Sequence, residues 1–315
     1  MRRKKSHLHY LRKRGRKQVQ HLLPQRHCGA VASAAVFTAW QNPSAGNIAA
    51  MSAFFAATLT EQLGMVFGFY LVNTVAGIGF GFLLERALAK KRIWVESPAP
   101  GQYRHELVGN LVFLTVLVLT STAAMHWSVV RFGPDSFARG CATFAAMYFG
   151  FQAYLYLLHR ALHLPWLVRF HRWHHVSRVT TPLTGQSMGA VEAVGWAIGY
   201  LLLPAGLSLV APLSVVGLLA YLSFNILGNM IGHANAEASP PAPGLWYRSL
   251  VATVFVYHAL HHLRWTGHYG FASTWADRLF GTEWPDWMPL YEQVSAGQPL
   301  HQSEVRKPAE KQLGA

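Results

Sequence analysis

Charged residues are what this sequence has least of. Of its 315 residues only 13% are Asp, Glu, Lys or Arg, whereas 52% are hydrophobic. Soluble domains carry about 25% charged residues, so long stretches of this chain must avoid water. Uncharged apolar runs of about 20 residues, the length that crosses a bilayer, recur along the chain. The composition therefore indicates an integral membrane protein.

Acidic residues are the scarcer of the two signs of charge. The chain has 13 Asp and Glu against 27 Lys and Arg, a formal net charge of +14, and residues 1–26 hold ten Lys and Arg without an acid. A basic excess is also typical of nucleic-acid binding. Here the charges flank apolar runs, as the positive-inside rule describes. We expect residues 1–26 to form a basic extension on the cytoplasmic side, and we expect no nucleic-acid partner. The alternatives are that this extension binds nucleic acid, or that the natural protein starts at Met51.

Cysteine and several motifs are nearly or wholly missing. Cys28 and Cys141 show no paired spacing, which excludes a disulfide framework. The chain has no HExxH motif, the signature of a zinc-dependent hydrolase. It also has no internal repeats and no recognisable fused electron-carrier domain.

The apolar runs predict four or more membrane-spanning helices. Residues 64–84, 107–130 and 140–158 are three such runs. Residues 193–232 contain no charge and carry Pro204 and Pro212 near their middle, which favours two spans joined by a tight hairpin. Two shorter apolar halves, between residues 28 and 60, are interrupted by a polar Gln-Asn-Pro-Ser stretch and are too short to span.

Basic residues after the first run predict the orientation. Lys90, Lys91 and Arg92 mark its cytoplasmic end, and alternation then brings residues 158 and 232 to the same side. The same alternation places residue 63 on the outer side of the membrane, whereas the basic N-terminus favours the cytoplasmic side. Whether residues 28–60 cross the membrane is therefore left open. The expected organisation is a basic extension with an interrupted apolar segment (1–60), a transmembrane scaffold (61–139), a histidine-rich domain (140–283) and a soluble tail (284–315).

Ten of the seventeen histidines gather in two windows, each beginning at the end of an apolar run. Their spacings of three and four place side chains on one face of a helix. Imidazole is a ligand for iron, zinc, copper and nickel, and two well-coordinated metals need about eight to ten ligands. The candidate ligands are His159, His163, His171, His174, His175, His233, His258, His261, His262 and His268.

The remaining histidines are isolated, and a lone histidine is usually a surface or hydrogen-bonded residue. They are His7, His9, His21, His27, His105, His126 and His301.

The histidine segments also carry a resemblance. HRALH (159–163), HRWHH (171–175), HAN (233–235) and HALHH (258–262), followed by GHYGF and WADRLFGT, resemble the fatty acid hydroxylase/sterol desaturase superfamily over about residues 140–283. The resemblance implies an all-α integral membrane protein whose cytoplasmic helical cap holds two iron ions, with zinc as a possible substitute in purified protein. It implies molecular oxygen as co-substrate, a separate electron-donor protein, and hydroxylation, desaturation or oxidative demethylation of a fatty acyl, sterol or carotenoid-like lipid.

The resemblance assigns nine of the ten histidines as ligands and leaves His268 open. The family usually has Asn at this position, so His268 is either a tenth ligand or a group beside the ligands. Glu192, Asn235 and Asp277 stand at positions that the family keeps polar and would orient imidazoles through their second nitrogen. For Asp277 a salt bridge to an arginine is the alternative.

Two further expectations concern the substrate path and a rival function. Trp166, Trp173, Phe224 and Trp246 are candidates for lining a lipid path, with packing or interfacial anchoring as the alternative. The rival function is a metal-binding or metal-transporting membrane protein. A transporter would place ionisable groups along its spans, whereas here the histidines crowd at the ends of the spans.

Overall fold

The computed structural model describes residues 46–239 and 253–306, and within them the protein is helical with no β-strand. The helices are α2 (Gly46–Ala56), α3 (Leu59–Ala87), η1 (Ala89–Lys91), α4 (Gln102–His126), α5 (Phe137–Leu162), α6 (Val168–His175), η2 (Thr184–Gln186), α7 (Ala190–Val210), α8 (Val215–Gly232), α10 (Phe255–Arg264), α11 (Trp275–Leu279), α12 (Trp287–Ser295) and α13 (Gln302–Val305). The basic extension, Trp246 and four of the lone histidines (His7, His9, His21 and His27) lie outside the described residues.

Five of the described helices are long and apolar enough to cross a membrane: α3, α4, α5, α7 and α8. The prediction of an all-α integral membrane protein with four or more spans is confirmed. The predicted hairpin is also present, because α7 ends at Val210 and α8 begins at Val215. Pro212 lies in the turn between them, whereas Pro204 lies inside α7.

Short polar side chains define where several spans begin. Thr58 and Glu61 form a reciprocal capping box at the start of α3, and Ser136 accepts from the third backbone N–H of α5. Ser214 does the same at the start of α8. Such caps satisfy N–H groups that have no partner within the helix.

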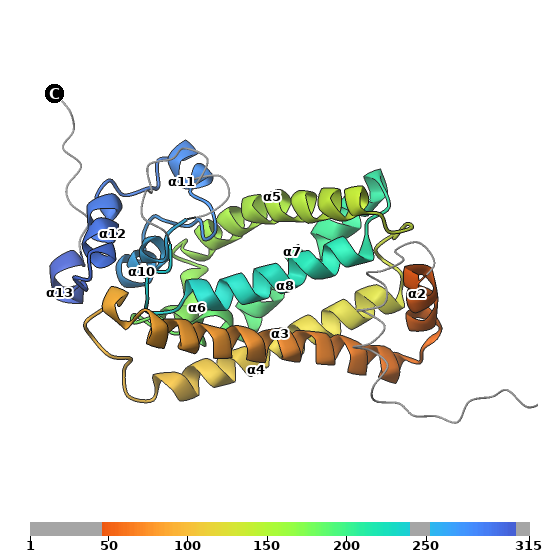
Figure 1. The fold of residues 1–315 in the computed structure, drawn as a ribbon, viewed down its shortest axis with the longest axis horizontal. Helices are drawn as coiled ribbons and strands as arrows, with labels where there is room; N and C mark the ends of the chain where they lie inside the picture. Colours follow the sequence, from red (N-terminus) through yellow and green to blue (C-terminus); the bar gives the residue numbers. More distant parts are fainter. Residues whose placement is uncertain (1–45, 240–252, 307–315) are drawn as a thin grey trace, which may run out of the picture. The chain divides into compact units, whose positions relative to one another are not determined.

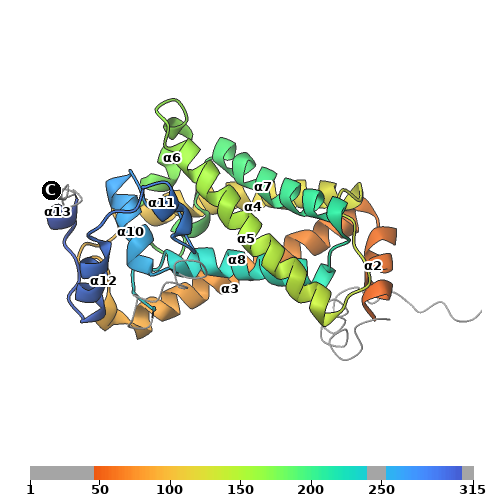
Figure 2. The same ribbon diagram turned by 90° about the horizontal axis from the view of Figure 1, so that it is seen from above.

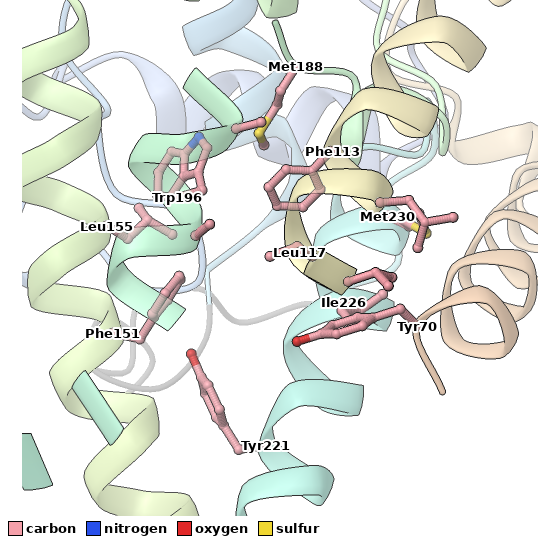
Figure 3. Close-up of a cluster of buried hydrophobic side chains, with 14 of the residues drawn as sticks. Tyr70, Phe113, Leu117, Phe151, Leu155, Met188, Trp196, Tyr221, Ile226 and Met230 are labelled. Atoms are coloured by element: carbon pink, nitrogen blue, oxygen red, sulfur yellow. The ribbon is translucent and has the colours of Figure 1, made fainter. Parts of the chain in front are cut away.

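The five span helices run alongside one another, and α10 to α13 gather at one end of them in both views (Figures 1 and 2). In this bundle α3 packs on α4 and α8, α5 packs on α7 and α8, and α4 packs on α7. All five helices contribute to the core, with Tyr70, Phe113, Phe151, Trp196 and Tyr221 among the buried residues (Figure 3).

A second core lies under the shorter helices at that end. Tyr257 of α10 and Tyr291 of α12 are buried in it together with Trp94 and Leu300. The backbone of Leu300 donates to Ile93 and accepts from Val95. The described part of the expected tail, residues 284–306, is therefore packed against the histidine-bearing helix α10.

Candidate metal centre

Helix α6 has two chemically different faces. His171, His174 and His175 are buried, whereas Arg169 and Arg172 are exposed. This division follows from the sequence spacing, because residues three and four apart share a face of a helix. One short helix thus presents three imidazoles inward and its charges outward.

The other candidate ligands stand at helix ends or on α10. His159 lies in the last turn of α5, and His163 is the residue that caps its C-terminus. His233 caps the C-terminus of α8. His258, His261 and His262 lie on α10, where they are fully or almost fully buried.

The structure brings nine of the ten candidate histidines into two groups, each with ligand nitrogens within 4.8 Å of one another. The five-histidine group is His159, His163, His171, His175 and His261, and the four-histidine group is His174, His233, His258 and His262. Helices α6 and α10 contribute to both groups, whereas α5 contributes only to the five-histidine group and α8 only to the four-histidine group.

Hydrogen bonds set the orientation of six of these rings. In each, Nδ1 faces an oxygen that only accepts, so Nδ1 carries the proton and Nε2 keeps a lone pair. The acceptors are Tyr269 O for His159 (2.7 Å), Glu192 Oε1 for His171 (2.7 Å), Ser187 O for His174 (3.3 Å), Asn229 O for His233 (2.6 Å), Gly267 O for His261 (2.8 Å) and Ser177 O for His262 (3.0 Å).

The lone pairs of the five-histidine group face one another at short distance. The Nε2 atom of His175 lies 3.1 Å from Nε2 of His171 and 3.1 Å from Nε2 of His261. The Nε2 atoms of His171 and His261 carry no proton, and Nε2 of His175 can donate at most one proton. At least one pair of lone pairs is therefore left in contact, and a cation between them would relieve the repulsion.

The four-histidine group repeats this arrangement. Nε2 of His258 lies 3.0 Å from Nε2 of His233 and 3.2 Å from Nε2 of His262. Neither group contains a thiolate or a carboxylate. A donor set of imidazoles alone fits iron, zinc, copper or nickel and does not fit calcium or magnesium.

Burial keeps the rings outside the spans neutral. It lowers the pKa of each ring well below the ordinary histidine value, and neighbouring histidines lower all six pKa values further. The rings concerned are His171, His174, His175, His258, His261 and His262. Neutral imidazole is the form that binds metal.

His268 lies outside both groups, unlike the other nine candidates. Its Nδ1 donates to Tyr257 O (3.0 Å), and its Nε2 accepts from the backbone N–H of Trp284 (3.0 Å). The ring also stacks on Tyr257 at 3.5 Å between centroids. Both nitrogens are occupied, so this ring has no lone pair left for a metal.

The lone histidines that the structure describes take ordinary roles. His105 bonds to Trp173 O at 2.9 Å, and His126 bonds to Gln62 at 3.0 Å. His301 is half-exposed and lies 4.0 Å from Glu96.

Glu192 contacts a candidate ligand directly. Its Oε1 accepts from His171 Nδ1 (2.7 Å) and from Trp196 Nε1 (3.2 Å). Its Oε2 is buried without a hydrogen-bond partner. Glu192 and five histidines line a cavity whose other walls include Phe113, Leu155 and Trp196.

Neither Asp277 nor Asn235 bonds directly to a candidate metal ligand. Asp277 accepts from the backbone N–H groups of Tyr269 and Gly270, and so fixes the loop whose Tyr269 carbonyl orients His159. No arginine among the described residues forms a salt bridge with Asp277. Asn235 accepts from the backbone N–H of Trp94, and no hydrogen bond joins it to a candidate ligand.

Sequence reasoning missed Glu106, which is wholly buried on α4. Its carboxylate accepts from four side chains: Gln102 (2.8 Å), Ser177 (2.6 Å), Thr181 (2.6 Å) and Thr184 (2.6 Å). These contacts tie segment 177–187 to α4, and that segment supplies the carbonyls that orient His262 and His174. The sequence signal that could have pointed to Glu106 is a single acidic residue at the edge of an apolar run, one helical turn after Gln102.

The aromatic candidates for the lipid path have separate locations. Phe224 lines a second cavity, which shares Asn225, Asn229, His258 and Phe271 with the first. Trp166 is 65% exposed. Trp173 stacks on His105 at 4.0 Å between ring centroids.

The segment that holds the grouped histidines is similar to known proteins. Residues 144–282, which include all nine grouped histidines, match the family model described as fatty acid hydroxylase. A very-long-chain aldehyde decarbonylase GL1-6 of Oryza sativa subsp. indica is 32% identical over 195 residues, 59% of this chain and 30% of the relative. Protein CER1-like 2 of Arabidopsis thaliana is 30% identical over 213 residues, 63% of this chain and 33% of the relative.

A further relative is very-long-chain aldehyde decarbonylase CER1 of Arabidopsis thaliana, 28% identical over 142 residues, 44% of this chain and 23% of the relative. The chain thus spans about a third or less of the length of these curated relatives. No solved structure matches it.

Proposed function

Because residues 144–282 form a fatty acid hydroxylase domain of the fatty acid hydroxylase/sterol desaturase superfamily, we propose that this protein is a membrane-bound, oxygen-dependent di-iron oxidoreductase acting on a C–H bond of a lipid. The observation that carries the proposal is the pair of adjacent groups in which buried, neutral imidazoles turn unprotonated Nε2 atoms toward one another. The reaction class is hydroxylation, desaturation or oxidative demethylation.

In this proposal the five-histidine and four-histidine groups each hold one iron, and zinc can substitute in purified protein. The bound irons supply oxygen activation, the chemistry that no side chain can perform. Glu192 holds the proton on His171 Nδ1 and so keeps Nε2 available as a ligand. The burial of the rings excludes water, and the apolar wall with Phe113, Leu155 and Trp196 holds the hydrocarbon chain beside them.

The metal end of the bundle is proposed to face the cytoplasm. Arg86 lies in the last turn of α3, and Lys90 and Lys91 follow in η1, at the end that packs beside Asn235 and the second core. Basic residues concentrate on the cytoplasmic side of membrane proteins. A separate donor protein on that side would supply the electrons.

A second candidate reaction comes from the relatives, whose names describe very-long-chain aldehyde decarbonylases. If this chain shares that chemistry, its substrate is a long-chain aldehyde and its product is a hydrocarbon one carbon shorter. A hydroxylase would instead give an alcohol with the full carbon count. Lipid profiling of a deletion strain, in which the unconverted substrate accumulates, separates the two reactions.

Metal analysis tests the centre itself. Protein produced with iron supplied should contain about two irons per chain, and His174→Ala should abolish turnover while the protein still inserts into the membrane. His301→Ala, which changes a half-exposed histidine outside both groups, is the matched control. About one iron per chain, or full turnover by His174→Ala, would contradict a two-metal centre. Transport of metal into vesicles without oxygen consumption would favour the metal-transporter alternative.

A further inference from the structure

The outer side of α6 carries only positive charge. We call it the arginine face and define it by the exposed residues Arg169 and Arg172. No Asp or Glu occurs between Asp135 and Glu192, and no salt bridge joins these arginines to a described residue. The charge of this face is therefore not neutralised within the described part of the chain.

The arginine face lies directly behind candidate metal ligands. Arg169 and Arg172 occupy the outer side of the helix whose inner side holds His171, His174 and His175. An α-helix with its side chains is about 10–12 Å across. A protein docked on this face would therefore lie about one helix diameter from the imidazole groups.

Trp265 connects the interior to the surface beside this helix. Its ring centroid lies 4.6 Å from that of His175 and 6.4 Å from that of His163. The side chain is partly exposed, whereas His175 is buried. Trp265 thus places a conjugated ring between solvent and a ligand of the five-histidine group.

The backbone at Trp265 is strained. It caps α10 with φ +68° and ψ −20°, the left-handed region, where helices usually end in glycine. For a bulky residue this conformation costs about 1–2 kcal/mol. Strain of this kind persists where the surrounding structure or the function requires the side chain, and here the side chain packs on a candidate ligand.

We propose that the arginine face docks an acidic one-electron carrier protein and that Trp265 is the residue through which its electrons reach the five-histidine group. This inference rests on the proposed oxidoreductase function, which needs an external reductant. In each encounter the carrier loses one electron and the centre gains one. For hydroxylation, two such electrons and two protons convert one oxygen atom of O2 to water while the other enters the lipid.

An acidic protein fits this face better than an anionic membrane surface does. Charge complementarity steers a carrier to its docking site and sets its orientation. A lipid headgroup would need the arginines alone and would gain nothing from an aromatic ring in contact with a metal ligand. The pairing of the charge with Trp265 therefore favours a redox partner.

A binding measurement tests the face. The iron-loaded full chain in phosphatidylcholine nanodiscs is titrated with a plant-type [2Fe–2S] ferredoxin, which serves as the acidic probe. Arg169→Glu/Arg172→Glu should weaken binding about tenfold or more, and binding of the unaltered protein should weaken with added salt. Arg86→Glu/Lys90→Glu, which changes the net charge equally at two exposed residues near the end of α3, should bind like the unaltered protein.

Two outcomes would overturn the docking face. Equal weakening by both double variants would mean that only the overall charge matters. If Arg169→Glu/Arg172→Glu binds ferredoxin normally and instead loses affinity for phosphatidylserine vesicles, the arginines serve the membrane surface.

A kinetic measurement tests Trp265. Stopped-flow reduction of the oxidised iron centre is followed with reduced ferredoxin and, separately, with dithionite. Trp265→Leu should slow reduction by ferredoxin about tenfold or more, leave iron content and reduction by dithionite unchanged, and be largely rescued by Trp265→Phe. An equal loss with both reductants would make Trp265 a structural residue, and no loss with either would remove it from the electron path.

The readouts separate this inference from the function on which it rests. If the protein holds no iron but ferredoxin still binds the arginine face, the proposed function fails and the docking face stands. If iron is bound and reduced by dithionite but ferredoxin neither binds nor reduces it, the docking face fails and the function stands.

Discussion

At the scale of single residues, the centre depends on which ring nitrogen carries the proton. Five backbone carbonyls and one carboxylate accept from Nδ1 of six histidines and leave Nε2 as the ligand atom. Backbone carbonyls cannot be removed by substitution. Glu192 is the one acceptor that comes from a side chain, so it offers a direct test of this orientation.

Replacing Glu192 should weaken metal binding by the five-histidine group. Glu192→Ala leaves His171 Nδ1 without its acceptor, and the loss of such a partner lowers metal affinity about 10–100-fold. Glu192→Gln keeps an amide oxygen for His171 Nδ1 and should lose less. Iron retention during titration with a chelator measures both variants, and an equal loss in the two would contradict the orienting role.

His268 should be dispensable for metal binding. It has a positive φ of 53°, which asparagine tolerates better than most residues, so His268→Asn should keep about two irons per chain. His268→Ala leaves Tyr257 O and the Trp284 N–H without partners and should destabilise the fold by about 1–3 kcal/mol. Metal analysis with thermal unfolding distinguishes the cases, and the loss of one iron in His268→Asn would make His268 a ligand.

At the scale of elements, segment 177–187 links the span α4 to the metal centre. Glu106 holds it through three hydroxyl groups, while the carbonyls of Ser177 and Ser187 orient His262 and His174. The acid sits inside α4, which begins at Gln102, although the uncharged run begins only at residue 107. The helix is longer than the apolar run because the segment supplies hydrogen bonds that satisfy the buried carboxylate.

Helix α4 closely approaches Ser187 and Met188 at Gly109. This position should therefore not tolerate a side chain. An alanine Cβ there would lie 2.6 Å from Ser187 Oγ, 2.6 Å from Trp173 Nε1 and 2.8 Å from the backbone nitrogen of Met188. Gly109→Ala should therefore cost about 1–3 kcal/mol and reduce iron retention.

The matched control is Gly79→Ala on α3, where nothing lies within 4 Å of the added atom. It should be neutral or stabilising by up to about 1 kcal/mol, because alanine is the better helix former. Thermal unfolding in detergent compares the two variants, and equal melting temperatures would contradict the close packing of α4 on this segment.

At the scale of the whole molecule, five spans bring the two histidine windows to one end of the bundle. Their order along the chain predicted this, because α5 and α8 both run toward that end. Because the centre contains buried rings from both α6 and α10, protonation of these rings in acid should affect the whole centre.

Acid should destabilise the metal-free protein. Burial lowers the pKa of the six rings on α6 and α10, whereas the unfolded chain titrates near pH 6.5. As the pH falls below about 6.5, the unfolded state takes up protons that the folded state refuses, so the free energy of unfolding decreases. Melting temperatures of chelator-treated protein between about pH 8 and pH 5 should fall on the acid side; a flat profile would contradict neutral buried rings.

Several features were predictable from the sequence because they depend on neighbours along the chain. Span length follows from the apolar runs, and the buried face of α6 follows from the spacing in HRWHH. The start of α4, the role of Glu106 and the place of Asn235 were not predictable in this way. Each depends on partners that are remote in sequence, such as the loop hydroxyls around Glu106 or Trp94 beside Asn235.

The sequence by itself determined a helical membrane protein with two histidine-rich segments, each at the end of a span, because apolar length and a spacing of three or four are local properties of the chain. Only the tertiary structure decided how the nine histidines divide into groups of five and four and why His268 stands apart. That division depends on contacts such as His262 with Ser177 and His261 with His175. These residues are more than eighty positions apart, and they meet only when α10 folds against α6.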